Sequence, residues 1–236
     1  MARARQGARE GLVVVADQQS AGRGRFQRTW ESRPGRSLLF SVLLRPDRQG
    51  LPLARRHLAA AALALALAEG ARAVAGAELR LKWPNDLIST APARGEAKVG
   101  GILAESADGA IVVGAGVNVG WAPEGMGATC LEALVSGGVS RAEVLVESLL
   151  ALDRLYGQWD LVSRLYRQAC ATVGRQVEVR LSGLAPALVG TAVGLDGDGR
   201  LIVRPAAGQD GSAELVTVAA GDVSHVRPAP PPGAPG

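Results

Sequence analysis

Short apolar segments separated by polar, glycine-bearing loops make up the first half of the chain, a pattern typical of β-strands. Leu12–Ala16 is predicted to be a buried strand, and after the arginine-rich loop Asp17–Trp30 a second strand follows at Ser37–Leu44. Three further strands are predicted at Glu78–Lys82, Lys98–Ser106 and Ala110–Val119, the last two joined as a hairpin. We therefore expect a mixed, largely antiparallel sheet.

Helical patterns occupy the segments between and after these strands. Leu53–Glu69 consists mostly of alanine and leucine, and Gly70 follows it at a position where glycine favours a helix end. Further on, a Ser140 and Glu143 capping box begins a helix that runs to about Gln158, and a second helical segment is predicted at Leu161–Ala169. Helices packed on a sheet give an α/β (α+β) fold for this part of the chain.

The pattern changes at Val173, where short β-branched runs alternate with glycine and aspartate. Four strands are predicted at Val177–Leu181, Leu188–Leu195, Leu201–Arg204 and Glu214–Val218. They form a small C-terminal β-barrel, and a proline- and glycine-rich tail follows it. The predicted organisation is a first domain over residues 1–171, the barrel over 172–228 and a disordered tail over 229–236.

The amino-acid composition indicates in which compartment of the cell the protein works. The chain has 236 residues, and its longest apolar run, Leu58–Ala68, is much shorter than the roughly 20 residues that cross a bilayer. We therefore predict no membrane partner. Cys130 and Cys170 are isolated thiols without metal-ligand spacing, which argues against a disulfide scaffold or a zinc site and predicts a cytoplasmic protein.

Basic residues are concentrated at the start of the chain and are nearly all arginine. Residues 1–56 hold 12 arginines against 4 acidic residues, a charge that favours an anionic ligand. Of the 26 basic residues only Lys82 and Lys98 are lysine. Because an ammonium is a compact charge on a flexible stem and a guanidinium is a rigid fork, either lysine is a candidate for a chemical role.

Four short motifs carry candidate chemistry. They are GRGR at 22–25 in the arginine-rich loop, KWPND at 82–86, KVGGILAE at 98–105 and GAGVN at 114–118. Glycines beside fixed cations allow the backbone to approach an anion closely, and two glycines on a strand leave room for a flat ligand. In this order, and with Trp30 a few residues after GRGR, the motifs resemble the catalytic core of the biotin protein ligases. The terminal barrel resembles the Src-homology-type C-terminal domain of that family.

This resemblance implies an enzyme that activates biotin with ATP and Mg²⁺ to biotinyl-5'-AMP, with release of pyrophosphate. The biotin then passes to one lysine of a biotin carboxyl carrier domain. The resemblance is to a stand-alone ligase, because too few residues precede the first strand for an N-terminal DNA-binding domain, and no nucleic-acid partner is predicted. Whether the chain forms a homodimer stays open at this point.

The resemblance also assigns roles by motif position. Lys98 and Arg25 would be the catalytic residues, and Gln19 would bind the ureido ring of biotin. The biotin-binding set implied by the family is Gln19, Gly22, Arg23, Gly24, Arg25, Lys98 and Gly101. The ATP-binding set is Arg23, Arg25, Trp30, Asn85, Asp86 and Asn118. No metal ligand is assigned.

Two alternative functions and two departures from the family pattern complete the expectations. A lipoate or octanoate ligase or transferase has the same fold, and a non-catalytic biotin- or nucleotide-binding protein belongs to a different class.

Gln27 occupies a position where the family usually has glycine. The family's Ser-Thr-Asn segment, which helps to hold the biotin ring, would lie upstream of Leu12 and is absent, so we expect either a misassigned start codon or a weakened ligase. Trp83, Pro84 and Trp121 are expected to pack rather than to touch a ligand.

Overall fold

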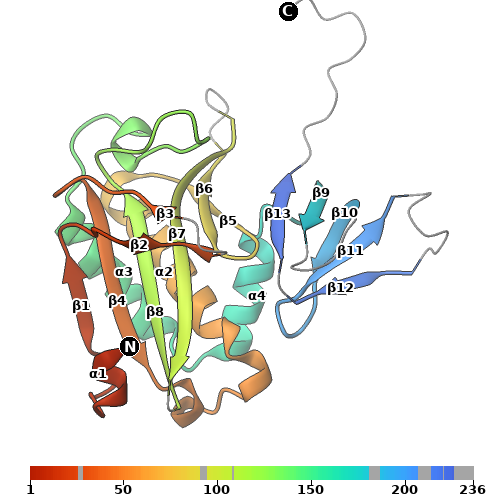
Figure 1. The fold of residues 1–236 in the computed structure, drawn as a ribbon, viewed down its shortest axis with the longest axis horizontal. Helices are drawn as coiled ribbons and strands as arrows, with labels where there is room; N and C mark the ends of the chain where they lie inside the picture. The colour runs from red at the N-terminus through yellow and green to blue at the C-terminus, as the bar shows by residue number, and fades with distance from the viewer. Residues whose placement is uncertain are drawn as a thin grey trace, which may run out of the picture. The chain divides into compact units, whose positions relative to one another are not determined.

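The computed structural model describes residues 1–25, 29–90, 95–107, 109–180, 187–206, 214–219 and 221–225. It divides into two compact units, residues 1–170 and 171–236 (Figure 1). The first unit combines a six-stranded antiparallel sheet with helices, and the second is all β in its described part. The predicted fold class is confirmed.

The sheet of the first unit has the strand order β1-β4-β8-β7-β6-β5. Its strands are β1 (Val13–Ala16), β4 (Ser37–Leu44), β5 (Leu79–Lys82), β6 (Asp86–Ser89), β7 (Ala97–Ala107) and β8 (Ala110–Asn118). Five of these were predicted within a few residues. Strand β6 was missed because KWPND suggested only a corner, whereas the turn ends at Asn85 and the chain pairs with β5 again from Asp86. Leu87, Ile88 and Ser89 are all buried, so β6 has no alternating pattern to reveal it.

Helices cover one face of this sheet. They are α2 (His57–Ala75), α3 (Arg141–Leu155) and α4 (Trp159–Ala169), with a short α1 (Ala2–Arg5) at the start and 3-10 turns at Pro46–Gln49, Leu53–Arg55 and Leu131–Ala133. Figure 1 shows α2 and α3 behind the strands. The alternate residues Ile111, Val113, Ala115 and Val117 of β8 are buried on the sheet. The residues between them are partly exposed and belong to the opposite face.

The boundaries of α2 differ from the predicted Leu53–Glu69 at both ends. The helix begins at His57, after a separate 3-10 turn, and continues through Gly70 to Ala75. Gly76, with φ of 65°, is the residue that ends it. Gly70 was misinterpreted because its role is tertiary: a Cβ there would overlap Ser148 of α3, so glycine is what lets the two helices approach.

By length and mean hydropathy (1.6) alone, the segment Leu53–Ala75 could cross a membrane. More than half of its most apolar window is buried within the protein, however. Helix α2 packs on α3 and on strands β5, β7 and β8, and its alanines and leucines form the core there. The apolar composition of α2 is therefore accounted for by packing inside this fold.

Gly70→Ala is expected to destabilise the first unit by about 1–3 kcal/mol, because the added methyl group overpacks the contact with Ser148. The free energy of unfolding in urea measures this. Gly138→Ala is the control, since a Cβ at Gly138 would meet no atom within 4 Å. Equal stability of the two variants would contradict a close contact between α2 and α3.

A polar cluster joins the start of the chain to the end of α3. The Tyr156 hydroxyl donates to Glu10 Oε1 at 2.5 Å, and the backbone N–H of Arg45 donates to the same oxygen at 2.8 Å. Burial and the bond to Glu10 both raise the pKa of the Tyr156 hydroxyl above its usual value. The neutral phenol therefore contributes to the stability of the folded state.

The contribution of Tyr156 is expected to depend on pH. Because its pKa is raised on folding, the stabilisation is fully present below the unfolded pKa of about 10 and is lost as the pH rises above that value. Urea unfolding of Tyr156→Phe should show a smaller loss of stability between neutral and strongly alkaline pH than the native chain shows. Tyr166, whose pKa is also raised by burial, keeps part of the dependence in both proteins. Identical alkaline profiles would exclude a role for the Tyr156 hydroxyl.

The second unit contains a five-stranded antiparallel sheet with the order β12-β11-β10-β9-β13. Its strands are β9 (Gln176–Arg180), β10 (Leu188–Leu195), β11 (Leu201–Pro205), β12 (Val216–Val218) and β13 (Asp222–His225). The predicted turn after β10 is closed by Asp196 Oδ1, which accepts from the N–H groups of Asp198 and Arg200. Strand β13 was missed because its sequence, Asp-Val-Ser-His, holds one apolar residue. The predicted strand end at Leu181 and the predicted tail lie outside the described residues.

Candidate active site

A bare patch of backbone lies on the face of the sheet opposite the helices. Gly101 of β7 and Gly116 of β8 are direct register partners, so neither strand projects a side chain there. A Cβ on Gly116 would lie 2.8–3.1 Å from three atoms of the Trp30 indole. A Cβ on Gly101 would lie 3.5 Å from Nζ of Lys98 and 3.7 Å from Oδ1 of Asp86. The two glycines therefore form a floor shared by an aromatic ring and an ion pair.

A two-stranded hairpin brings Trp30 to this floor. Strands β2 (Gly22–Arg23) and β3 (Thr29–Trp30) pair with Gly22 opposite Trp30, and they cross in front of the sheet in Figure 1. Gly22 is buried, and a Cβ there would overlap the carbonyl oxygen of Trp30. The first glycine of the GRGR motif is therefore required by the close approach of the two hairpin strands.

Lys98 occupies the second position of β7, and a loop after β8 fixes its backbone. Its N–H donates to the carbonyl of Gly127 and its carbonyl accepts from Thr129, both at 2.8 Å. Its ammonium lies 2.6 Å from Asp86 Oδ1 and 5.9 Å from the centre of the Trp30 ring. The side chain is 37% exposed, so the charge is held in place but remains accessible to a ligand.

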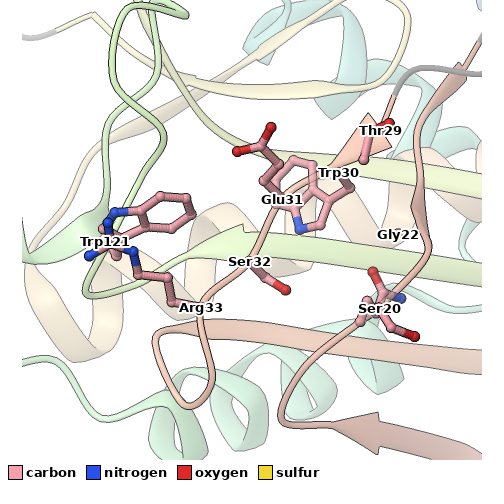
Figure 2. Close-up of a pocket in the computed structure, with 9 residues that line it drawn as sticks. Ser20, Gly22, Thr29, Trp30, Glu31, Ser32, Arg33 and Trp121 are labelled. Atoms are coloured by element: carbon pink, nitrogen blue, oxygen red, sulfur yellow. The ribbon is translucent and has the colours of Figure 1, made fainter.

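Gln19, Gly22 and Trp30 line an open pocket of about 420 Å³ beside this cluster. Figure 2 shows its wall continuing through Ser32 and Arg33 to Trp121, whose ring lies apart from that of Trp30. The Arg33 guanidinium lies 4.7 Å from the centre of the Trp121 ring. Aromatic faces, an amide and a cation suit a ligand that is part flat ring and part anion.

Trp121, expected to pack, lies in the pocket wall with the Arg33 guanidinium over its ring, and its expected lack of ligand contact stays a prediction. Trp83, by contrast, is 3% exposed and packs in the core as predicted. Arg33 was not among the expected site residues, although it falls within the arginine-rich first quarter of the chain. Only the loop geometry distinguishes it from the other arginines there.

Asn118 lies at the end of β8, buried opposite Ser37 of β4. Its amide nitrogen donates to the Thr129 carbonyl at 3.1 Å, which leaves Oδ1 without a hydrogen-bond partner among the described residues. Asn85 uses its amide nitrogen to hold Ile102 of β7, through a 3.0 Å bond to that carbonyl. Their predicted roles in ATP binding stay predictions.

The remaining predicted residues lie around the hairpin. Arg23 is exposed on β2, and Gly24 and Arg25 follow it directly. Burial raises the pKa of the Tyr166 hydroxyl, and the positive charge of Arg25 partly opposes that rise. Lys82, the other lysine, pairs with Glu96 at 2.9 Å, although it is the register partner of Asp86 in the β5–β6 pair. Gln27, where the sequence departs from the family pattern, lies outside the described residues.

Comparison with known proteins identifies the family of this chain. Residues 4–121 match the biotin/lipoate A/B protein ligase family, and residues 172–226 match the biotin protein ligase C-terminal domain. The chain belongs to the biotin protein ligase family. The expectation drawn from its four motifs is thereby confirmed.

Individual family members are similar over most of the chain. The biotin–[acetyl-CoA-carboxylase] ligase of Mycobacterium tuberculosis is 35% identical over 96% of this chain and 84% of its own length. The bifunctional ligase/repressor BirA of Bacillus subtilis is 29% identical over 85% of this chain and 64% of its own length.

Solved structures of biotin protein ligases share the fold. The ligase of Aquifex aeolicus in complex with biotin and ATP superposes with a TM-score of 0.73 at 26% identity, covering 94% of this chain and 91% of that one. The ligase of Leishmania major in complex with biotin gives a TM-score of 0.64 at 25% identity, covering 93% of this chain and 92% of that one.

Proposed function

We propose that this chain is an ATP-dependent biotin protein ligase that forms biotinyl-5'-AMP and transfers biotin to a lysine of a carboxyl carrier domain. The observation that carries the proposal is the Lys98 ammonium, held by Asp86 over Gly101 and beside the ring of Trp30, a residue of the pocket wall. Family membership and relatives named as ligases of acetyl-CoA carboxylase support the same activity.

In the first half-reaction an oxygen of the biotin carboxylate attacks the α-phosphorus of ATP. A new P–O bond forms, the bond to the β-phosphate bridging oxygen breaks, and pyrophosphate leaves. The two reactants are both anions, so the protein contributes mainly positioning and positive charge. The Lys98 ammonium is paired with Asp86 in the free protein. In the reaction it moves from Asp86 to the carboxylate and phosphate oxygens, between which negative charge develops.

In the second half-reaction the neutral amine of the acceptor lysine attacks the acyl carbon of the adenylate. An amide bond forms, the mixed anhydride bond breaks, AMP leaves and the amine loses a proton. No protein nucleophile is required. Both cysteines lie outside the four motifs, Cys170 being buried in the core.

For the nucleotide, the Trp30 and Trp121 rings in the pocket wall supply flat surfaces suited to a base. A resident metal fits less well. Within the described ranges no group of three His, Cys, Asp or Glu side chains could hold an ion, and Asp86 is already paired with Lys98. Mg²⁺ therefore enters as the MgATP complex, bound mainly through substrate phosphates.

The setting and self-association of the ligase are also proposals. Use of ATP and two free thiols support a cytoplasmic location. Strand β1 is an edge of the sheet, and its Val14 and Val15 are more than half exposed, which supports a dimer formed by pairing of two such edges. Sedimentation equilibrium should give a dimer mass, and a monomer mass at all concentrations would contradict the pairing.

Pyrophosphate exchange tests the proposed activity and separates it from its rivals. Incubated with MgATP and labelled pyrophosphate, the protein should incorporate label into ATP when biotin is present. Lipoate or octanoate should give little exchange. Preference for either of these acids would indicate the lipoate branch of the family, and no exchange with any of the three acids would indicate a binding protein without ligase activity.

A further inference from the structure

Gly116 is the residue on which the Trp30 ring rests. Three indole atoms, Cε2, Cζ2 and Nε1, approach the position that a Cβ of residue 116 would take within 2.8–3.1 Å. Such distances are too short for a methyl group, and the indole is a rigid plane that cannot bend away at one edge. Any side chain at this position would therefore displace the whole ring.

The same ring borders the catalytic cation expected at Lys98. The ammonium lies 5.9 Å from the ring centre, within the range of a cation–π attraction, and 2.6 Å from Asp86 on its other side. Gly101, the register partner of Gly116, lies next to that ammonium, since a Cβ at Gly101 would be 3.5 Å from Nζ of Lys98. The position of the ring over Gly116 thus defines one wall of the space that Lys98 occupies.

We infer that Gly116 is a positioning residue of the ligase reaction: it lets the Trp30 indole lie in contact with β8, and the indole keeps the Lys98 ammonium beside the reacting oxygens. This inference rests on the proposed function. Gly116 itself touches no substrate; it acts through Trp30. The contact links residues 86 positions apart in the chain, and it ties the GRGR hairpin to the GAGVN strand.

Gly116→Ala tests the inference directly. The single-turnover rate of adenylate formation at saturating biotin and MgATP should fall by about 10- to 100-fold, since a displacement of about 1 Å at a catalytic group costs up to about 10²-fold. Saturating substrates separate this effect on rate from any loss of affinity.

Gly114→Ala is the matched control. Gly114 lies on the same strand and, two residues away, on the same face of the sheet. A Cβ there would meet the Ser41 hydroxyl at 3.3 Å, a group that can rotate, and backbone oxygens at 3.6 Å or more. Its rate should stay within a few-fold of the native rate.

A double variant shows whether Gly116 acts through Trp30. Trp30→Ala removes the ring and slows the reaction, but it also frees the space that the added methyl group needs. Adding Gly116→Ala to Trp30→Ala should therefore cause no further loss of rate. If Gly116→Ala alone does not fold, the comparison of Trp30→Ala with the double variant still tests the inference. The double variant should fold as Trp30→Ala does, because the ring that the methyl group would displace is absent.

Three results would overturn the inference: a native rate in Gly116→Ala, an undiminished loss when the substitution is added to Trp30→Ala, or a double variant that fails to fold while Trp30→Ala folds. Failure of the proposed function is a separate result, because it appears in the native protein as absence of adenylate. The variants are compared only with a native protein that has shown the activity.

Discussion

Replacing Lys98 with alanine is expected to slow biotinyl-adenylate formation by about 10²–10³-fold, the usual cost of removing one group that stabilises charge in a transition state. The ammonium is accessible, paired with Asp86 and placed beside the Trp30 ring. It can therefore leave the Asp86 carboxylate and bind the reacting oxygens of biotin and ATP. Biotin binding should change much less, because this charge contributes most when negative charge is shared between carboxylate and phosphate. Single-turnover kinetics and calorimetry measure the two effects separately.

Lys82→Ala is the control for this prediction. Lys82 is the other lysine of the chain and lies opposite Asp86 in the β5–β6 pair, but its ammonium is ion-paired with Glu96. Its replacement should leave the rate within a few-fold of the native value. Lys98→Arg should remain slow, because a planar guanidinium cannot take the place of a compact ammonium. An unchanged single-turnover rate in Lys98→Ala would refute the catalytic assignment.

Gly22→Ala is expected to weaken binding of biotin and MgATP and to lower activity by about 10²-fold, since small displacements of site residues have costs of that order. A methyl group at this position would overlap the carbonyl oxygen of Trp30, a backbone atom that cannot rotate away. The β2–β3 hairpin must therefore open or change register, and Gln19 and Trp30 leave their places in the pocket wall.

Isothermal calorimetry with biotin, and then with biotin and a non-hydrolysable ATP analogue, measures the loss in Gly22→Ala. Gly138→Ala, which adds a methyl group to open space, should bind both ligands as the native protein does. The unfolding free energy of Gly22→Ala should change little, because the hairpin lies outside the main sheet. Native affinity in Gly22→Ala would show that the hairpin does not form part of the ligand site.

The fold could be predicted from the sequence wherever local pattern determines structure. Strand β4 follows from its long continuous apolar run, and helix α3 follows from its apolar spacing and from the Ser140 cap, whose Oγ accepts from the Glu143 N–H. Gly70 shows the limit of this reasoning. Its sequence context predicts a helix end, but its contact with Ser148 of another helix decides its place in the middle of α2.

In the candidate site, too, the sequence motifs predict which residues take part, but only the fold shows how they lie together. The motifs predict Lys98, Asp86 and Trp30 as site residues, but they do not predict that Lys98 lies next to both Asp86 and Trp30. The Lys98–Asp86 pair depends on the register of β6 with β7, and β6 was itself not predicted. The contact of Trp30 with Gly116 depends on how the hairpin lies across β8, which no spacing in the sequence records.

The central claim is that this protein attaches biotin to a carrier domain, and intact-mass spectrometry of a purified acceptor domain tests it most directly. After incubation with the protein, biotin and MgATP, the acceptor should gain the mass of one biotin less one water. An acceptor whose target lysine is replaced by arginine should gain nothing. No mass gain on an acceptor that another biotin protein ligase modifies under the same conditions would contradict the claim.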